Sequence, residues 1–231
     1  DQRIVHKVGR FMTVAALQFS AMALFAKAAS AHLSGPQVAW LRFALGLPLV
    51  VVPLMRGQRL RPVDYRSLFL RGLFGSFAVL TYFLAIAHLP VGIATLLNNS
   101  SPLFVALFSF LFLREPLGRN TLWALGVTSV GVALVALGGA QSAGAGRVSG
   151  GTVGWVLVGM VSAVMSGGAV TTIRSMRQRE GSWEIFLSFC LVGFVLTGVP
   201  CALTWVRPTL TDVLWVVGMS GCSAIGQMAS A

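Results

Sequence analysis

Apolar residues fall into eight long runs along the chain, separated by short polar segments that contain glycine or proline. The runs cover approximately residues 11–29, 37–55, 68–88, 91–113, 120–138, 152–173, 183–205 and 212–231. Each is close to the roughly 20 residues that an α-helix needs to cross the hydrocarbon core of a bilayer. The pattern predicts an all-α integral membrane protein, a polytopic helical bundle with eight visible transmembrane helices.

The composition supports the same class of protein. Hydrophobic residues make up 56% of the chain and charged residues only 10%, whereas soluble domains carry about 25% charged residues. The net charge of +11 comes from short connecting segments, so the positive-inside rule explains it better than nucleic-acid binding does. We therefore expect a lipid bilayer, and no nucleic acid, as a partner.

Lysine and arginine also predict the orientation. With the N-terminus in the cytoplasm, 13 of the 17 fall on the inner side, including Arg71 at the start of the third run. Tryptophans support these helix ends, because all six lie within about one turn of a predicted end, as in an interfacial belt. We expect a multi-pass protein of a bacterial inner membrane.

Two pairs of segments repeat at nearly the same spacing. Arg71–Gly75 resembles Val217–Gly221 at an offset of 146 residues, and Lys27 corresponds to Arg174 at an offset of 147. This spacing predicts a five-helix repeat unit. Since five is odd, the second copy must cross the membrane in the opposite sense, as in many secondary transporters. The first repeat would cover 1–140 and the second 141–231.

The fourth run contains the polar residues Asn98, Asn99, Ser100 and Ser101, followed by Pro102. Pro102 cannot donate a hydrogen bond to the carbonyl of Asn98. Polar groups at this depth are unfavourable unless they face protein or a water-filled cavity. We interpret Asn98, Asn99 and Ser101 as substrate-binding residues, and hydrogen bonding between helices is the alternative.

Other isolated polar residues are weaker candidates. Arg42 can bind an anionic or zwitterionic substrate, but it can equally extend to the outer interface or cap helix ends. Lys27 lies nearer the interface, which favours the second explanation. Tyr82 and Gln18 either line a cavity or bond a neighbouring helix. None of the six acidic residues lies deep within a run, so we expect no intramembrane carboxylate in this part of the chain.

Metal-binding and catalytic chemistry have little support. His32 and His88 fall at predicted outer helix ends, without a carboxylate or thiolate nearby in the sequence, so we expect neither a metal site nor a cofactor. Gly218–Gly221 fits the G-x-S-G pattern of intramembrane serine proteases, with Ser220 as the nucleophile, but no histidine base lies at membrane depth. A protease and a scaffold subunit that transports nothing are the alternatives to a transporter.

Three motifs resemble the EamA-like family of the drug/metabolite transporter superfamily. They are Pro36 with Ala39–Phe43, Tyr82–Ala87 with Leu89-Pro90, and Ser101–Phe104 with Leu113–Leu117. The resemblance covers the whole chain. It implies ten helices in two inverted five-helix repeats around a central cavity, and export or uptake of a small organic metabolite or drug, with no reaction on the substrate.

From this resemblance we expect the native protein to continue through two further helices, because the second repeat stops here after its third helix. Helices 1, 3 and 4 would line the cavity together with their counterparts in the second repeat. A small-molecule substrate is the expected partner, and self-association into a homodimer is left open.

Overall fold

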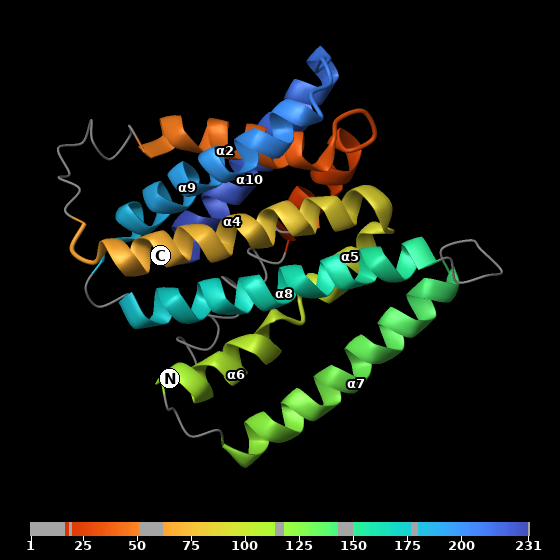
Figure 1. The fold of residues 1–231 in the computed structure, drawn as a ribbon, viewed down its shortest axis with the longest axis vertical. Helices are drawn as coiled ribbons and strands as arrows, with labels where there is room; N and C mark the ends of the chain where they lie inside the picture. The colour runs from red at the N-terminus through yellow and green to blue at the C-terminus, as the bar shows by residue number, and fades with distance from the viewer. Residues whose placement is uncertain are drawn as a thin grey trace.

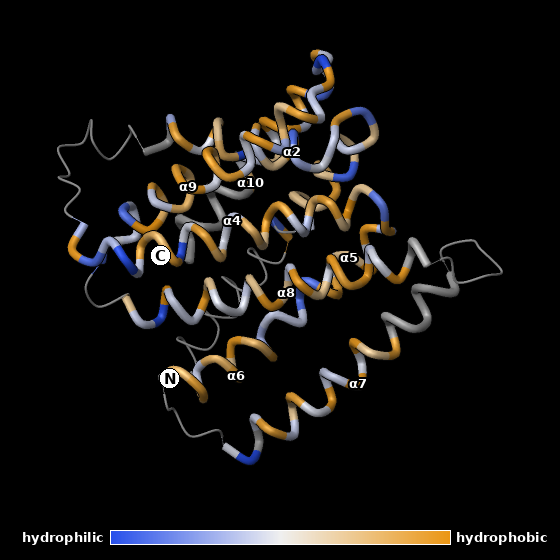
Figure 2. The backbone as a smooth tube through the Cα atoms, in the orientation of Figure 1, coloured by the Kyte–Doolittle hydropathy of each residue, from blue (hydrophilic) through white to orange (hydrophobic). Residues whose placement is uncertain are grey.

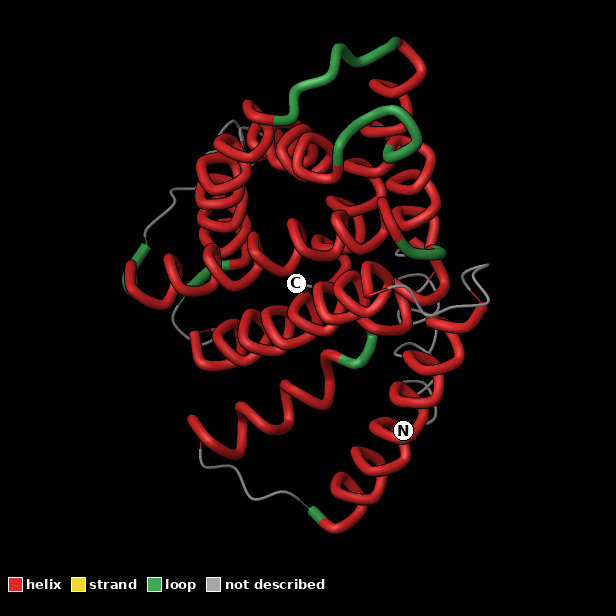
Figure 3. Tube along the Cα trace, turned by 45° about the vertical axis from the view of Figure 1, so that its right-hand side comes forward, coloured by secondary structure: helices red, strands yellow, loops and turns green. Residues whose placement is uncertain are grey.

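The computed structural model describes residues 17–18, 20–50, 62–113, 118–142, 150–176 and 180–230. Within these residues the regular structure is helical and contains no strand (Figure 3). A first helix covers Ser20–Ala29. The others are α2 (Gly35–Gly46), the short 3₁₀ helix η1 (Leu47–Val50), α4 (Tyr65–His88), α5 (Val91–Asn98), α6 (Ser101–Leu113), α7 (Arg119–Ser142), α8 (Gly150–Met176), α9 (Ser182–Leu203) and α10 (Leu210–Ser230).

Proline and capping residues fix several of these ends. α2 begins with Pro36 in its first turn, where the missing N–H costs no hydrogen bond. The side chain of Asp64 accepts from the Ser67 N–H at the start of α4, which satisfies one free donor of that helix. α4 ends as Leu89 becomes extended, because a residue before proline disfavours the helical conformation.

The fourth predicted helix is broken, which corrects the uninterrupted run expected over 91–113. α5 ends at Asn98 and α6 begins at Ser101. Pro102 has no N–H to donate to the hydrogen-bond pattern of the helix. The hydroxyl of Ser100 donates instead to the Leu97 carbonyl at 2.6 Å. The two short helices still form one 22-residue apolar stretch, Val91–Phe112, that is long enough to cross a membrane.

α4 lies at the centre of the bundle and contacts both α8 and α9 (Figure 1). α2, α9 and α10 lie on one side of α4, and α8, α6 and α7 on the other. The main buried cluster fills the space where α2, α4, α5, α8 and α10 meet. Its fully buried side chains include Val38, Phe83, Ile86, Leu97, Val216 and Met219.

Gly159, Ala163 and Gly167 form a stripe of small residues along α8. A Cβ added at Gly159 would lie 2.8 Å from Leu97, and one added at Gly167 would lie 2.5 Å from Phe104. Ala163 is fully buried. The stripe therefore allows α8 to pack closely against α5 and α6.

Many large apolar side chains are exposed on the outside of the bundle. Apolar residues make up most of each helix, and hydrophilic residues gather toward several helix ends (Figure 2). Phe69 is 57% exposed and Trp123 76% exposed. Among the residues that the structure describes, four helices are long and apolar enough to cross a membrane, namely Tyr65–His88, Val91–Phe112, Val153–Met176 and Ser182–Leu203. Ser20–Ala29, Thr121–Leu134 and Leu210–Cys222 are shorter apolar helices. The ten-helix count and the inverted repeats stay predictions.

Candidate functional site

Two arginines from different helices converge on one phenylalanine ring inside the bundle. The guanidinium carbon of Arg42 on α2 lies 5.7 Å from the ring centroid of Phe189 on α9, and that of Arg71 on α4 lies 4.6 Å from it. Arg42 is 7% and Arg71 8% exposed. The charge count along the sequence grouped Arg71 with the residues of the inner flank, and the structure buries its side chain almost two turns into α4.

Glycines provide the room for this arrangement. A Cβ added at Gly75 would overlap Arg71 Nη1 and lie 2.8 Å from the Phe189 ring. On α2, a Cβ at Gly46 would lie 2.9 Å from Cys190 Sγ. Because neither glycine has a side chain, α2 and α4 both approach α9 closely, and the guanidinium of Arg71 folds back along its own helix.

The surroundings of the two arginines contain few polar groups. Nε and Nη1 of Arg71 are buried without a hydrogen-bond partner among the described residues, and no described carboxylate forms an ion pair with it. The guanidinium groups of Arg42 and Arg71 lie against the same ring, so their like charges repel each other. The site therefore places Arg71 in an apolar region, where a charge without a counterion is strongly unfavourable.

The predicted substrate residues around the helix break have different environments. Asn98 Oδ1 accepts from Ser162 Oγ at 3.0 Å and Ser166 Oγ at 3.2 Å, both on α8. Asn99 is exposed and Ser101 half-buried. The contacts of Asn98 are those expected if the residue bonds neighbouring helices. Both bonds use the amide oxygen of Asn98, and a substrate contact by Asn98 stays a prediction.

Tyr82 and Gln18 are the remaining predicted site residues. Tyr82 is buried on α4, and its hydroxyl lies 3.2 Å from Thr95 Oγ1 on α5. Gln18 has a buried Oε1 with no hydrogen-bond partner among the described residues. Ser162 connects Asn98 to the α4 side of the site, because its hydroxyl also lies 2.9 Å from the Ala78 carbonyl, one turn before Tyr82.

Lys27 caps the end of α4. Its Nζ donates to the carbonyl oxygens of Ile86 at 2.7 Å and Leu89 at 3.2 Å. Carbonyls at a helix C-terminus lack partners within the helix and carry partial negative charge, so a lysine stabilises them. This contact gives Lys27 a structural role at the helix end.

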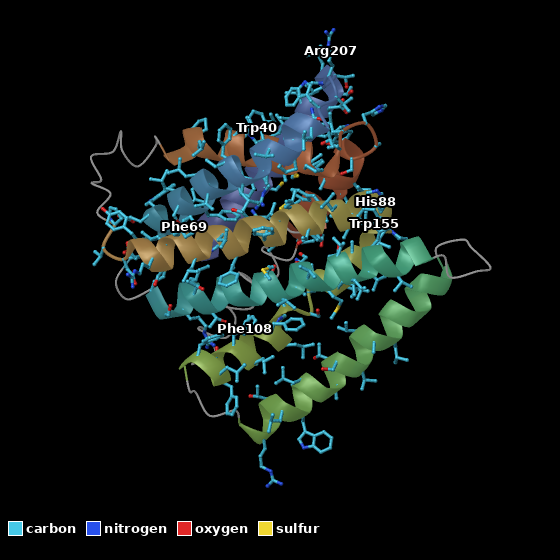
Figure 4. The ribbon with its side chains drawn as sticks, viewed as in Figure 1. Trp40, Phe69, His88, Phe108, Trp155 and Arg207 are labelled. Atoms are coloured by element: carbon cyan, nitrogen blue, oxygen red, sulfur yellow. The ribbon has the colours of Figure 1, made fainter. Side chains whose placement is uncertain are left out.

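The residues considered for metal binding and proteolysis do not assemble a site within the described part of the chain. His88 stacks on Trp155 with ring centroids 3.5 Å apart (Figure 4), and no group of three metal-ligating side chains is found there. Ser220 is buried, and its Oγ has no hydrogen-bond partner among the described residues. A serine nucleophile requires a neighbouring base, so this arrangement gives Ser220 no activation.

Comparison with known proteins adds independent information. The model of the EamA-like transporter family matches residues 10–137. The chain is 33% identical over 221 residues to the pseudopaline exporter of Pseudomonas aeruginosa, covering 93% of this chain and 74% of that protein. It is 25% identical over 221 residues to an uncharacterized transporter of Helicobacter pylori, covering 90% and 72%. A crystal structure with a TM-score of 0.65, at 22% identity, covers 94% of this chain and 77% of its own and shows a shared fold.

Proposed function

Because the chain belongs to the EamA-like transporter family, we propose that it is a secondary-type transporter that exports a small organic metabolite or drug by alternating access. It acts in a bacterial inner membrane with its N-terminus in the cytoplasm. The name of the exporter that it resembles supports the direction of transport. No reaction on the substrate is involved.

The broken helix is the observation that carries this proposal. The break between α5 and α6 interrupts one apolar stretch of membrane length. The break lies next to α8, because Asn98 accepts hydrogen bonds from Ser162 and Ser166 on that helix. Discontinuous helices at the junction between two halves are where secondary transporters build their substrate sites, because the freed backbone groups need protein, water or substrate as partners.

The proposed substrate contacts come from the helices that meet around α4. They are Asn98, Asn99, Ser101, Arg42, Tyr82 and Gln18. Arg42 on α2 and Tyr82 on α4 are both buried and supply one wall. Asn98 supplies the wall next to α8. Substrate would enter between the two proposed repeats, 1–140 and 141–231. The relative movement of the repeats would open the site to one side of the membrane at a time.

Hydrogen bonds between residues far apart in the sequence are found at both ends of the bundle, where alternating access needs gates that open in turn. At one end, the buried side chain of Gln37 bonds the backbone of Val206. At the other, Oε1 of Glu180 accepts from the N–H groups of Val63 and Asp64 at 2.7 Å and 2.5 Å. In each transport cycle, one connection would open while the other holds.

The experiment compares extracellular and intracellular metabolites, without a preselected substrate, in strains that lack or overproduce the protein. A compound that accumulates outside in proportion to the protein, and is then counter-transported by purified protein in liposomes, supports export. If no compound responds in either strain, and purified protein moves none of those tested, the proposal fails.

The role of Asn98 is tested on the same transport assay. Asn98→Leu should reduce transport about tenfold or more while membrane abundance stays near normal. Thr128→Val is the matched control, because Thr128 is exposed on α7 and bonds its own helix. The double variant Ser162→Ala/Ser166→Ala removes only the helix contacts, so an equal transport loss in it would show that Asn98 merely joins helices.

A further inference from the structure

The buried residues Arg42 and Arg71 indicate a class of substrate, which membership of the family alone does not specify. We propose that Arg42 and Arg71 together bind a carboxylate of the transported compound, so that the substrate is an organic anion or a zwitterion. This inference rests on the proposed transport function and adds the class of substrate. It assigns a binding role to Arg71 in addition to Arg42.

The first argument is charge. Both guanidinium groups approach the same ring, and each side chain is more than nine-tenths buried. Two like charges in a medium of low dielectric constant repel each other, and each is unfavourable there by itself. Among the described residues, no carboxylate pairs with Arg71. A bound anion would neutralise this charge.

The second argument is hydrogen-bonding capacity. Nε and Nη1 of Arg71 are buried and have no partner among the described residues. The five N–H donors of a guanidinium form a planar fork that matches the two oxygens of a carboxylate. The cation–π contact with Phe189 holds Arg71 in place, but a ring accepts no conventional hydrogen bond from the edge of the fork. The unused donors thus point to a planar oxyanion as the ligand.

The third argument is position. Arg42 and Arg71 lie on α2 and α4, and Phe189 and Cys190 lie on α9, which contacts both of these helices (Figure 1). Gly75 and Gly46 let the three helices approach closely, with Arg71, Phe189 and Cys190 packed beside the two glycines. A charge where three helices meet is well placed to bind a substrate, if these helices move relative to one another in the proposed transport cycle.

The stripe of α4 that contains Arg71 also bounds the size of the substrate. Arg71, Gly75, Val79 and Tyr82 follow one another at helical spacing on one face. The 11 residues from Arg71 to Tyr82 correspond to roughly 16 Å along the helix axis. A metabolite of about this length, with its carboxylate at Arg71, would extend to the level of Tyr82.

The experiment measures thermal unfolding of the purified protein in nanodiscs made only of phosphatidylcholine. The probes are glutarate and glutaramide, which share their carbon skeleton but differ in charge. Glutarate should raise the unfolding temperature in a saturable way and glutaramide should not. Equal effects of the two compounds, or no effect of glutarate, would overturn the inference.

Variants then show whether Arg42 and Arg71 cause the stabilisation by glutarate. Arg71→Met and Arg42→Met should each raise the glutarate concentration for half-maximal stabilisation about tenfold or more, because a charge-assisted bidentate contact is lost. Arg66→Gln is the matched control, since it removes an exposed arginine from the same helix. Without glutarate, Arg71→Met should unfold at the same or a higher temperature, because it removes a buried unpaired charge. Lower stability together with an unchanged glutarate response would show a structural arginine.

Two further arms separate the remaining outcomes. An anionic lipid offers a phosphate to the same donors, so the measurement is repeated with phosphatidylglycerol added. A stabilisation that needs this lipid, and does not respond to glutarate, would overturn the inference. A glutarate response without any exported compound would refute the transport function and leave the anion site. Export that is insensitive to Arg71→Met would refute the anion site and leave the transport function.

Discussion

Gln37 and Val206 hold each other through two hydrogen bonds across 169 residues of chain. Nε2 of Gln37 donates to the Val206 carbonyl at 2.7 Å, and Oε1 of Gln37 accepts from the Val206 N–H at 3.1 Å. The Gln37 side chain is fully buried. It therefore satisfies both backbone groups of Val206 and anchors the α9–α10 connection to the first turn of α2.

Replacing Gln37 should destabilise the protein. Gln37→Leu leaves the N–H and the carbonyl of Val206 without their partners, and we expect a loss of about 1–3 kcal/mol of unfolding free energy. Gln37→Glu places a carboxylate oxygen against the Val206 carbonyl at a fully buried position, so it should lose at least as much as Gln37→Leu. Denaturant titration of the purified protein in detergent measures the difference. An unchanged unfolding midpoint in Gln37→Leu would contradict this role.

Glu180 forms the corresponding connection at the other end of the bundle. Its side chain is 6% exposed, and Oε1 accepts from two backbone N–H groups just before α4. Glu180→Ala should lose about 1–3 kcal/mol of unfolding free energy, because two buried donors lose their acceptor. Glu180→Gln retains an acceptor oxygen without the charge and should lose less. If the two variants prove equally unstable, the carboxylate acts by charge alone.

Gly75 should tolerate no side chain. A methyl group there overlaps Arg71 and the Phe189 ring, so Gly75→Ala should lower the unfolding free energy by about 1–3 kcal/mol. Gly131→Ala is the matched control. It introduces the same methyl group into α7, where nothing lies within 4 Å, and should leave stability unchanged or raise it by up to about 1 kcal/mol.

A second variant tests whether the overlap with Arg71 explains the effect of Gly75→Ala. Adding Arg71→Ala removes the overlapping guanidinium and should restore part of the lost stability. The double variant would be as unstable as the sum of the two single variants if the residues acted independently. The unfolding free energies of all four proteins provide this comparison.

The proposed orientation predicts opposite labelling of two exposed positions. In a protein without Cys190, Cys201 and Cys222, a cysteine introduced by Arg207→Cys should react with a membrane-impermeant maleimide in intact cells. One introduced by Tyr65→Cys should react only after permeabilisation. Both residues are exposed at helix ends, so accessibility depends on the side of the membrane. The reverse pattern would invert the topology.

Helix ends were largely predictable from local chemistry. Leu89-Pro90 marks the end of α4, and Gly35-Pro36 marks the start of α2, because proline restricts its own backbone and that of the residue before it. The break between α5 and α6 was not predicted, although Pro102 indicated that one hydrogen bond of the helix would be missing. Whether a helix bends or breaks at proline depends on other partners, here the hydroxyl of Ser100.

The candidate site was only partly predictable. Arg42 was recognisable because it lies inside an apolar run, but Arg71 lies close enough to a helix start to resemble an interfacial charge. Phe189 is one of many apolar residues in its helix, and only packing places it against both arginines. The partners of Asn98 lie on α8, 64 and 68 residues away, and no local pattern specifies such distant pairs.

Lys27, Gln37 and Glu180 all bind backbone atoms of a distant segment and not its side chains. The exposed side chains of Val63 and Val206 are therefore free to change during evolution, since almost any residue presents the same N–H and carbonyl. Proline is the exception at Val63, Asp64 and Val206, because it has no N–H to donate. Loops of this protein can thus diversify, and acquire new surface chemistry, without loosening the bundle that they connect.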